Sequence, residues 1–330
     1  MAEMDLANLK SSSVVKRYPG NPVLSAKDIP YHATLVFNAG VAKFRDRYVM
    51  VFRNDYGVEG KSLQGTNLGI AFSDDGMHWK VSDKPCFTMK TEEIRRAYDP
   101  RLTVVEGRCY MCFAVDTQHG IRGGIAVTDD LEHFEILSLS TPDNRNMVLF
   151  PEKINGNFAR LERPFPIYGR GAPEAFDIWY SDSPDCKYWG NSNLVLGSEQ
   201  VPFCNSKIGP AAPPVKTERG WLTLFHAVDK QPGQVFDSWD GRWGKRYTMG
   251  IMLLDLNEPW KIVGMSPEPL MVPELDYPYE MKGFRGSVLF PGGMILEDDG
   301  EVKIYYGAAD TVEALATARV EDLLALCVSG

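Results

Sequence analysis

The stretch Gly40–Arg53, GVAKFRDRYVMVFR, decides the fold of this chain of 330 residues. It predicts a strand, a tight polar turn and a return strand with alternating apolar residues, the pattern of a half-buried β-hairpin. Four further segments repeat it, each with a glycine or charged residues at the turn: Arg101–Ala114, Phe150–Leu161, Pro214–Phe225 and Met294–Tyr306. A hairpin that recurs along the whole chain indicates a repeat architecture.

A second type of hairpin follows each copy of the first. It has a strand of small and apolar residues, a turn rich in Ser and Asp, and a closing aromatic residue. The copies are Leu68–Trp79, Gly124–Phe134, Asp177–Trp189, Met249–Trp260 and a degenerate Ala314–Leu326. Two hairpins make a four-stranded sheet, and five such sheets around an axis make a β-propeller. We therefore predict an all-β fold, a five-bladed β-propeller with a central active-site pocket, over a β-sandwich or two small β-domains.

No linker or low-complexity segment divides the chain. We therefore predict a single catalytic propeller domain over residues 17–330, preceded by an N-terminal extension over residues 1–16. The extension is expected either to pack on a neighbouring copy or to be disordered, so a homo-oligomer stays open. The helices that we predict are short ones near Thr91–Arg96 and Val320–Leu326.

The overall charge and composition exclude several classes of partner. The net charge of −9 argues against a nucleic-acid partner. No apolar run approaches the roughly 18 residues of a membrane span, so no membrane partner is expected. No signal peptide is expected from the first residues, and the six cysteines lack metal-ligand spacing. These features predict a cytoplasmic protein with reduced thiols and no metal site.

Polar residues gather where the predicted strands begin or end, and matching ends of propeller blades converge on the axis. Cationic or hydrogen-bonding groups that suit a tetrahedral oxyanion come from Arg145, Arg163, Lys207 and His226. Groups that could bind sugar hydroxyls come from Asn38, Arg53, Asp55 and Asp310, while Tyr98 and Asp99 precede a proline. This combination fits a sugar together with phosphate.

Less specific explanations exist for the same residues. An arginine at a strand end is often a surface residue in an ion pair, and Asp99 before Pro100 could be a turn residue. His226 on an apolar strand could be an ordinary core histidine. The recurrence of similar polar insertions in all five repeats favours the pocket.

Several motifs together resemble glycoside hydrolase family 130, the family of the β-mannoside phosphorylases, from about Arg17 to Leu326. They are YDPR at 98–101, NRNMVLFPEKING at 144–156, KIG at 207–209, GWLTLFH at 220–226, LLDLNEP at 253–259 and YYGAADT at 305–311. The fold of that family is a five-bladed propeller, in agreement with the repeats.

The resemblance implies inverting phosphorolysis of a β-mannoside to α-D-mannose 1-phosphate and a shortened acceptor. Asp99 matches the general acid, whose proton is thought to reach the glycosidic oxygen through the mannose 3-hydroxyl. Arg145, Arg163, Lys207 and His226 match the phosphate positions. The mannose positions are matched by Asn38, Arg53, Asp55 and Asp310, and Tyr98 faces the pocket. Phosphate is then a co-substrate, and no cofactor is expected.

The linkage and the acceptor are less well defined. The YDPR motif resembles members that act on β-1,4-mannosides, including mannooligosaccharides and mannosyl-glucose. The alternatives are a β-1,2-mannobiose or oligomannan phosphorylase, a β-mannosidase, and a non-catalytic glycan-binding propeller. The chain departs from the family pattern after Arg163, at Ser287 and in an insertion at 229–246. Trp239 and Trp243 in the insertion are expected either to stack on a sugar or to form an oligomer contact.

Overall fold

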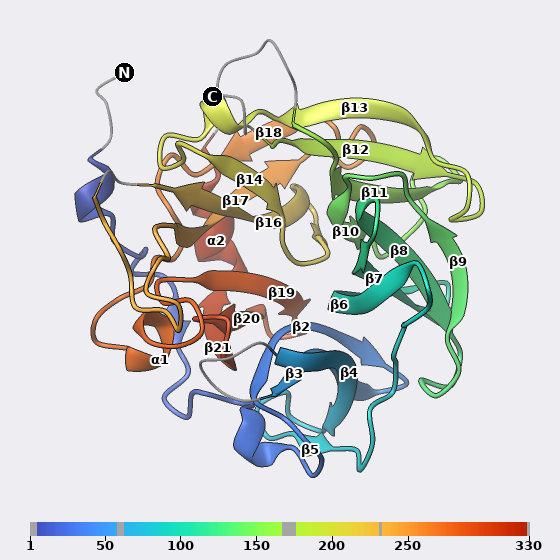
Figure 1. Cartoon of the computed structure of the whole chain (residues 1–330). Coiled ribbons are helices and arrows are strands. Elements are labelled where there is room, and N and C mark those ends of the chain that lie inside the picture. The colour runs from blue at the N-terminus through green and yellow to red at the C-terminus, as the bar shows by residue number, and fades with distance from the viewer. Residues whose placement is uncertain (1–4, 58–62, 167–175, 231–232, 329–330) are drawn as a thin grey trace.

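The computed structural model describes residues 5–57, 63–166, 176–230 and 233–328. This part of the chain is mostly β (Figure 1). Its helices are short: η1 (Leu6–Asn8), η2 (Ala26–Asp28), η3 (Ser198–Gln200), α1 (Pro278–Met281) and α2 (Val320–Leu326). None of its helices is long and apolar enough to cross a membrane.

Antiparallel strands follow one another in five groups along the chain. The first holds β2 (Leu35–Phe44), β3 (Arg47–Gly57), β4 (Leu63–Ser73) and β5 (Lys80–Val81). The second holds β6 (Ile94–Val105), β7 (Arg108–Thr117), β8 (Gly120–Thr128) and β9 (Glu135–Leu139). The third holds β10 (Arg145–Leu149), β11 (Phe158–Arg163), β12 (Ile178–Ser183) and β13 (Gly190–Leu196).

The fourth group holds β14 (Lys207–Pro210), β15 (Val215–Thr217), β16 (Gly220–Asp229), β17 (Arg246–Leu254) and β18 (Ile262–Met265). The fifth holds β19 (Leu289–Leu296), β20 (Glu301–Ala308), β21 (Val312–Arg319) and, from the other end of the sequence, β1 (Lys16–Arg17). The first predicted hairpin is therefore confirmed as β2–β3. Its turn places Arg45 and Asp46 at φ of 51° and 61°, as the tightest hairpin turns require.

Two sequence-based expectations were wrong in detail. The segment 91–96 is not helical, because Ile94 already begins β6 and pairs with Thr117 of β7. Strand pairing and the burial of Ile94 override the local helical preference. The segment Ala314–Leu326 is not a hairpin either, because it contains the end of β21 followed by α2.

The first and fifth groups are joined into one sheet of eight strands by a parallel pair, Gly293 of β19 with Val41 of β2. The hydrogen-bonded strands therefore form four sheets in the described chain, where separate sheets for all five repeats were predicted. Glycine permits this approach, since a Cβ on Gly292 would lie 2.0 Å from the carbonyl oxygen of Ala39.

The apolar core is divided into clusters that lie between consecutive groups of strands. One cluster, with Val51 and Met111, lies between the first and second groups. Others join the second to the third, the third to the fourth, the fourth to the fifth, and the fifth back to the first. Each group thus packs on its two neighbours, and the inner strand ends come together.

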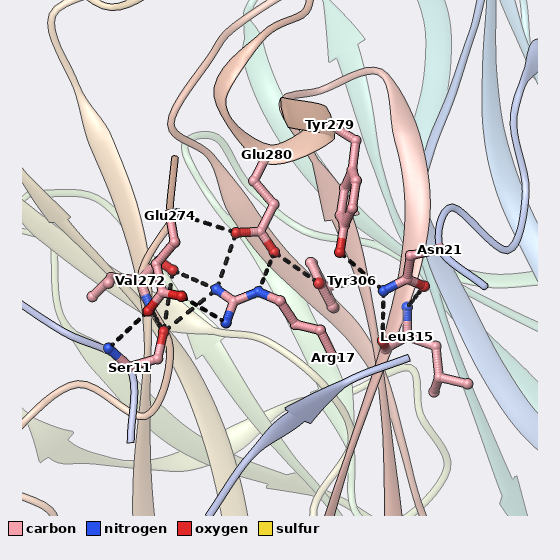
Figure 2. A network of polar contacts seen from close by, with 9 residues as sticks. All are labelled: Ser11, Arg17, Asn21, Val272, Glu274, Tyr279, Glu280, Tyr306 and Leu315. Atoms are coloured by element: carbon pink, nitrogen blue, oxygen red, sulfur yellow. Dashed lines mark hydrogen bonds and ion pairs between the residues drawn. The ribbon is translucent and has the colours of Figure 1, made fainter. Parts of the chain in front are cut away.

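Residues near the N-terminus complete the fifth group of strands. β1 pairs with β21, with Arg17 opposite Ala316. Figure 2 shows the buried side chain of Arg17 between Glu274 and Glu280, with Nε 2.7 Å from Glu280 Oε1 and Nη1 3.3 Å from Glu274 Oε2. Tyr306 donates to the same carboxylate of Glu280 at 2.9 Å. The network ties β1 to β20 and to α1, whose following loop reaches the cavity described next.

Candidate active site

A cavity of about 430 Å³ opens where the inner strand ends converge. All ten residues predicted for the site line it: Asn38, Arg53, Asp55, Tyr98, Asp99, Arg145, Arg163, Lys207, His226 and Asp310. These residues come from β2, β3, β6, β10, β11, β14 and β16 and from the turn after β20. The tertiary structure therefore brings together side chains that lie up to 272 positions apart in the sequence, from Asn38 to Asp310.

Three inner strands carry the same backbone irregularity at the cavity. The register of β2, β6 and β10 shifts at this point, and the bulges contain Asn38, Asp99 and Asn146. These residues have φ of 52°, 52° and 57°, in the left-handed region. A bulge redirects the side chain at the end of a strand, and all three residues line the cavity. Asp99 therefore belongs to a strand bulge and not to a simple turn.

Only one oxygen of the Asp99 carboxylate is held by described residues. Its Oδ1 accepts hydrogen bonds from Asn38 Nδ2 at 3.0 Å and from Arg53 Nη1 at 3.2 Å. The side chain is 15% exposed, toward the cavity. A carboxyl group that is held through one oxygen and lines a cavity is a candidate general acid.

The wall beside Asp99 is a chain of alternating charges. Arg53 binds Asp55 through Nε at 3.0 Å and Nη2 at 2.6 Å, a bidentate pair that fixes both side chains. Burial raises the pKa of Asp55, but the charge of Arg53 outweighs it and leaves that pKa below its ordinary value. The chain continues through Arg96, whose Nε lies 2.6 Å from Asp116, and Tyr98 donates to Asp116 at 2.8 Å.

Arg96 and Asp116 line the cavity but were missed by the sequence analysis. Neither lies in the quoted motifs, and an arginine and an aspartate 20 positions apart carry no sign of pairing. Asn146 was also missed as a site residue. Its signal was present, since it occupies in the third repeat the position of Asn38 and Asp99 in the first two.

Four basic groups gather on another part of the cavity wall. Arg145 of β10 pairs with Arg163 of β11 as a directly opposed residue. Arg163 Nη1 lies 3.2 Å from Nε2 of His226, and Lys207 lines the same cavity. Among the described residues, no carboxylate lies within ion-pair distance of Arg145, Arg163 or Lys207. The fold therefore gathers buried Arg163 and half-buried Arg145 and Lys207 without a carboxylate counter-ion among the described residues.

Burial and mutual repulsion perturb these groups strongly. Burial and the charge of Arg145 lower the pKa of Arg163 to about 9. Burial and the charges of Arg163 and Arg145 lower the pKa of Lys207 to about 6. The same effects, with burial first, hold the pKa of His226 well below its ordinary value, so its imidazole is neutral. Such a cluster destabilises the folded protein unless an anion neutralises it.

His226 is fully buried, as in the core-histidine explanation, but it also lines the cavity. Its Nδ1 has no hydrogen-bond partner in the described structure. Gly209 makes room for the ring, because a Cβ on Gly209 would lie 2.5 Å from His226 Cε1. The glycine of the KIG motif thus permits β14 to pass directly over the histidine.

The outer rim of the cavity is aromatic and comes partly from the insertion at 229–246. Trp243 stacks on Tyr247 with ring centres 6.0 Å apart, and the guanidinium of Arg285 lies 4.6 Å from the centre of the Trp243 ring. Trp239 instead packs edge-on against Phe284 and does not line the cavity. Arg285 also lies 4.0 Å from Asp310, whose pKa burial raises to about 6.

One of the other departures from the family pattern lies near this rim. Ser287, in the loop that carries Arg285, has a left-handed φ of 61°. The stretch after Arg163 lies largely outside the described residues, because 167–175 are not among them. Within the described ranges, there is no group of three or more His, Cys, Asp or Glu side chains that could hold a metal ion.

A comparison with protein families decides the classification. The family model described as beta-1,4-mannooligosaccharide phosphorylase matches residues 11–329. The chain belongs to glycoside hydrolase family 130. A β-1,4-mannooligosaccharide phosphorylase of Ruminococcus albus is 32% identical to this family 130 chain, over 94% of the chain and 90% of the relative. A 1,2-β-oligomannan phosphorylase of a Thermoanaerobacter strain is 31% identical, over 94% and 98% of the two chains.

Solved structures of family 130 agree with the fold. A β-1,2-mannobiose phosphorylase from Listeria innocua, in complex with β-1,2-mannobiose, superposes with a TM-score of 0.80 at 26% identity. The match covers 95% of this chain and 99% of that one. The resemblance inferred from the sequence motifs is confirmed.

Proposed function

We propose that this family 130 member is an inverting β-1,4-mannoside phosphorylase, with Asp99 as general acid and inorganic phosphate as nucleophile. One observation carries the proposal: basic side chains that have no carboxylate partner among the described residues line the same cavity as Asp99, whose carboxyl group is held through one oxygen. The 32% identical relative from Ruminococcus albus bears the corresponding name.

The cation cluster favours phosphorolysis over hydrolysis. An inverting hydrolase needs a second carboxylate to activate water. Phosphate is already an anionic nucleophile and needs positive charge to hold it in line with the anomeric carbon. Arg145, Arg163 and Lys207 supply that charge, and neutral His226 supplies a hydrogen bond. Phosphate neutralises the cluster and so removes the repulsion present without it.

The proposed reaction proceeds in one displacement. A phosphate oxygen attacks C1 of the mannosyl unit as the bond from C1 to the glycosidic oxygen breaks. The proton of Asp99 passes to that oxygen through the mannose 3-hydroxyl, which receives it and gives up its own. Inversion yields α-D-mannose 1-phosphate and an acceptor shortened by one unit.

The remaining wall residues hold the mannosyl unit in this proposal. Asn38, Arg53, Asp55 and Asp310 present donors and acceptors to its hydroxyls, and Tyr98 packs beside them. The bidentate pair of Arg53 with Asp55 keeps these groups fixed before the sugar arrives. Trp243 and Arg285 at the rim are placed to meet the acceptor.

The architecture enters the proposal as a five-bladed propeller in one domain. Five groups of strands, each packed on two neighbours, support it, and the parallel pair of β19 with β2 is a hydrogen-bonded contact between the last blade and the first. Phosphate is the co-substrate, and no further cofactor is part of the scheme.

The test is an assay of mannose 1-phosphate release from β-1,4-mannobiose, β-1,2-mannobiose and mannosyl-glucose, with and without phosphate. We expect strictly phosphate-dependent release, with the β-1,4 substrates preferred. Equal release of free mannose without phosphate would refute phosphorolysis. Preference for β-1,2-mannobiose would reassign the linkage, in line with the Thermoanaerobacter relative.

A further inference from the structure

We propose that Glu313 is a positioning residue that holds the Asn38 bulge of β2 so that the Asn38 amide engages Asp99. The proposal rests on the proposed function for its effect on turnover, but its structural part stands independently. Glu313 lies on β21 and is outside the cavity wall, so it touches neither reacting group.

Two hydrogen bonds, joined by the peptide link between Asn38 and Ala39, connect Glu313 to the proposed general acid. The backbone N–H of Ala39 donates to Glu313 Oε2 at 3.1 Å, in the fully buried interior. Ala39 follows Asn38, which has a left-handed φ of 52° in the bulge. Asn38 Nδ2 then donates to Asp99 Oδ1 at 3.0 Å. Because the bulge interrupts the ladder between Phe37 and Gly40, the Glu313 carboxyl replaces a strand as the partner of this N–H.

The surroundings of the bulge restrict the position of the Asn38 side chain while Glu313 is present. A Cβ on Gly307 would lie 2.2 Å from Asn38 Oδ1, so β20 packs directly against the amide. The backbone of Glu313 is itself anchored, since its N–H donates to the carbonyl of Leu24 at 2.9 Å. The carboxyl therefore acts as a fixed support behind the bulge.

Glu313 has no ion-pair partner in the described structure, and its Oε1 has no hydrogen bond. Burial raises its pKa to about 8, while the N–H of Ala39 and the charge of Arg101 oppose the rise. The other charged group acting on it is Asp99, which raises the pKa further. At neutral pH the group is thus uncharged, and a glutamine side chain can replace it in shape and in hydrogen bonding.

The experiment compares Glu313→Gln, Glu313→Ala and the wild type, with Glu297→Ala as a control at a carboxylate that directly follows β19. Glu297 binds Lys303 and Tyr48 away from the cavity. We expect Glu313→Ala to lower kcat by about 10- to 100-fold, with little change in KM for phosphate, because the acid is misplaced. Glu313→Gln should stay within about twofold of the wild type at pH 7, since it keeps the acceptor for the Ala39 N–H.

Above pH 8 the wild type should lose activity as Glu313 ionises near Asp99, and Glu313→Gln should lose less. Identical pH profiles, or an unchanged kcat in Glu313→Ala, would overturn the proposal. If the wild type shows no phosphorolysis, crystal structures still decide: Asn38 should leave Asp99 in Glu313→Ala and stay in Glu313→Gln. Should Glu313→Ala not fold, Glu313→Met serves as the apolar variant in both measurements.

Discussion

Arg145 and Arg163 face each other directly across β10 and β11, two like charges at one position of a strand pair. Such a pair destabilises a sheet unless something lies between the charges. Lys207 and His226 complete the enclosure from the neighbouring group of strands. The repulsion thus marks the place that the proposed phosphate occupies, and it has measurable consequences.

Replacing Arg163 should weaken phosphate binding without lowering the thermal stability of the protein. Arg163→Met should raise KM for phosphate by about 10- to 100-fold, since hydrogen bonds to a charged group are lost. The same change should leave the melting temperature without phosphate unchanged or higher, because it removes a buried cation whose pKa burial and Arg145 lower to about 9. Thermal unfolding and steady-state kinetics check both parts. A large fall in melting temperature would contradict the unpaired state of the guanidinium.

Lys207 should make stability and phosphate binding depend on pH. Its pKa is about 6 in the folded protein against 10.5 for an ordinary lysine. Between these values the unfolded state binds more protons, so this group makes the protein more stable as pH rises through that window. The slope of unfolding free energy against pH should therefore be smaller in Lys207→Met than in the wild type.

Phosphate should raise the pKa of Lys207 again and draw in a proton. Calorimetric titration at pH 8, in buffers of different ionisation enthalpy, should show uptake of up to about one proton. Lys207→Met should reduce that uptake. Binding with no net proton transfer in the wild type would show that the lysine is already charged before phosphate arrives.

Asp99→Asn should lower kcat by about 10²- to 10⁴-fold, the usual share of a general acid. The amide keeps the size of the carboxyl group and can still accept the hydrogen bond from Asn38. Phosphate binding should accordingly be retained, as measured by thermal stabilisation with phosphate. Residual turnover near the wild-type level would remove Asp99 from the mechanism.

Trp243 and Trp239 form a matched pair of tests for the acceptor side. Trp243→Ala should raise KM for the acceptor in the synthetic direction by about tenfold, because a large apolar face at the rim is lost. Trp239→Ala should leave that KM nearly unchanged, since Trp239 packs on Phe284 outside the cavity lining. Equal effects of the two substitutions would assign both residues to packing alone.

Arg17 should matter for stability and not for the chemistry. Arg17→Ala leaves Glu280 buried and unpaired, which should cost about 3–5 kcal/mol of unfolding free energy. The double variant Arg17→Met, Glu280→Gln should recover much of this loss, because no uncompensated charge remains. Urea unfolding of the three proteins gives the comparison, and a small loss in the single variant would mean that water reaches Glu280.

The sequence predicted ten of the residues that line the cavity, because the repeats place equivalent residues at equivalent strand ends. Asn38 and Asp99 were identified from their position before a hairpin, and both line the cavity. Arg96 and Asp116 were not identified, because their partnership depends on the register of β6 against β7. Trp243 and Trp239 could not be distinguished either, since their neighbours come from the loop near Arg285.

Taken alone, the sequence determined most of the hairpins, the family and the candidates for acid and cations, because turn residues and alternating apolar residues act over short distances. Only the tertiary structure decided which side chains meet. The merging of β19 with β2 and the support of Asn38 by Glu313 join residues more than 250 positions apart. Such contacts depend on close packing of backbones and on buried polar groups finding partners, and no local pattern records them.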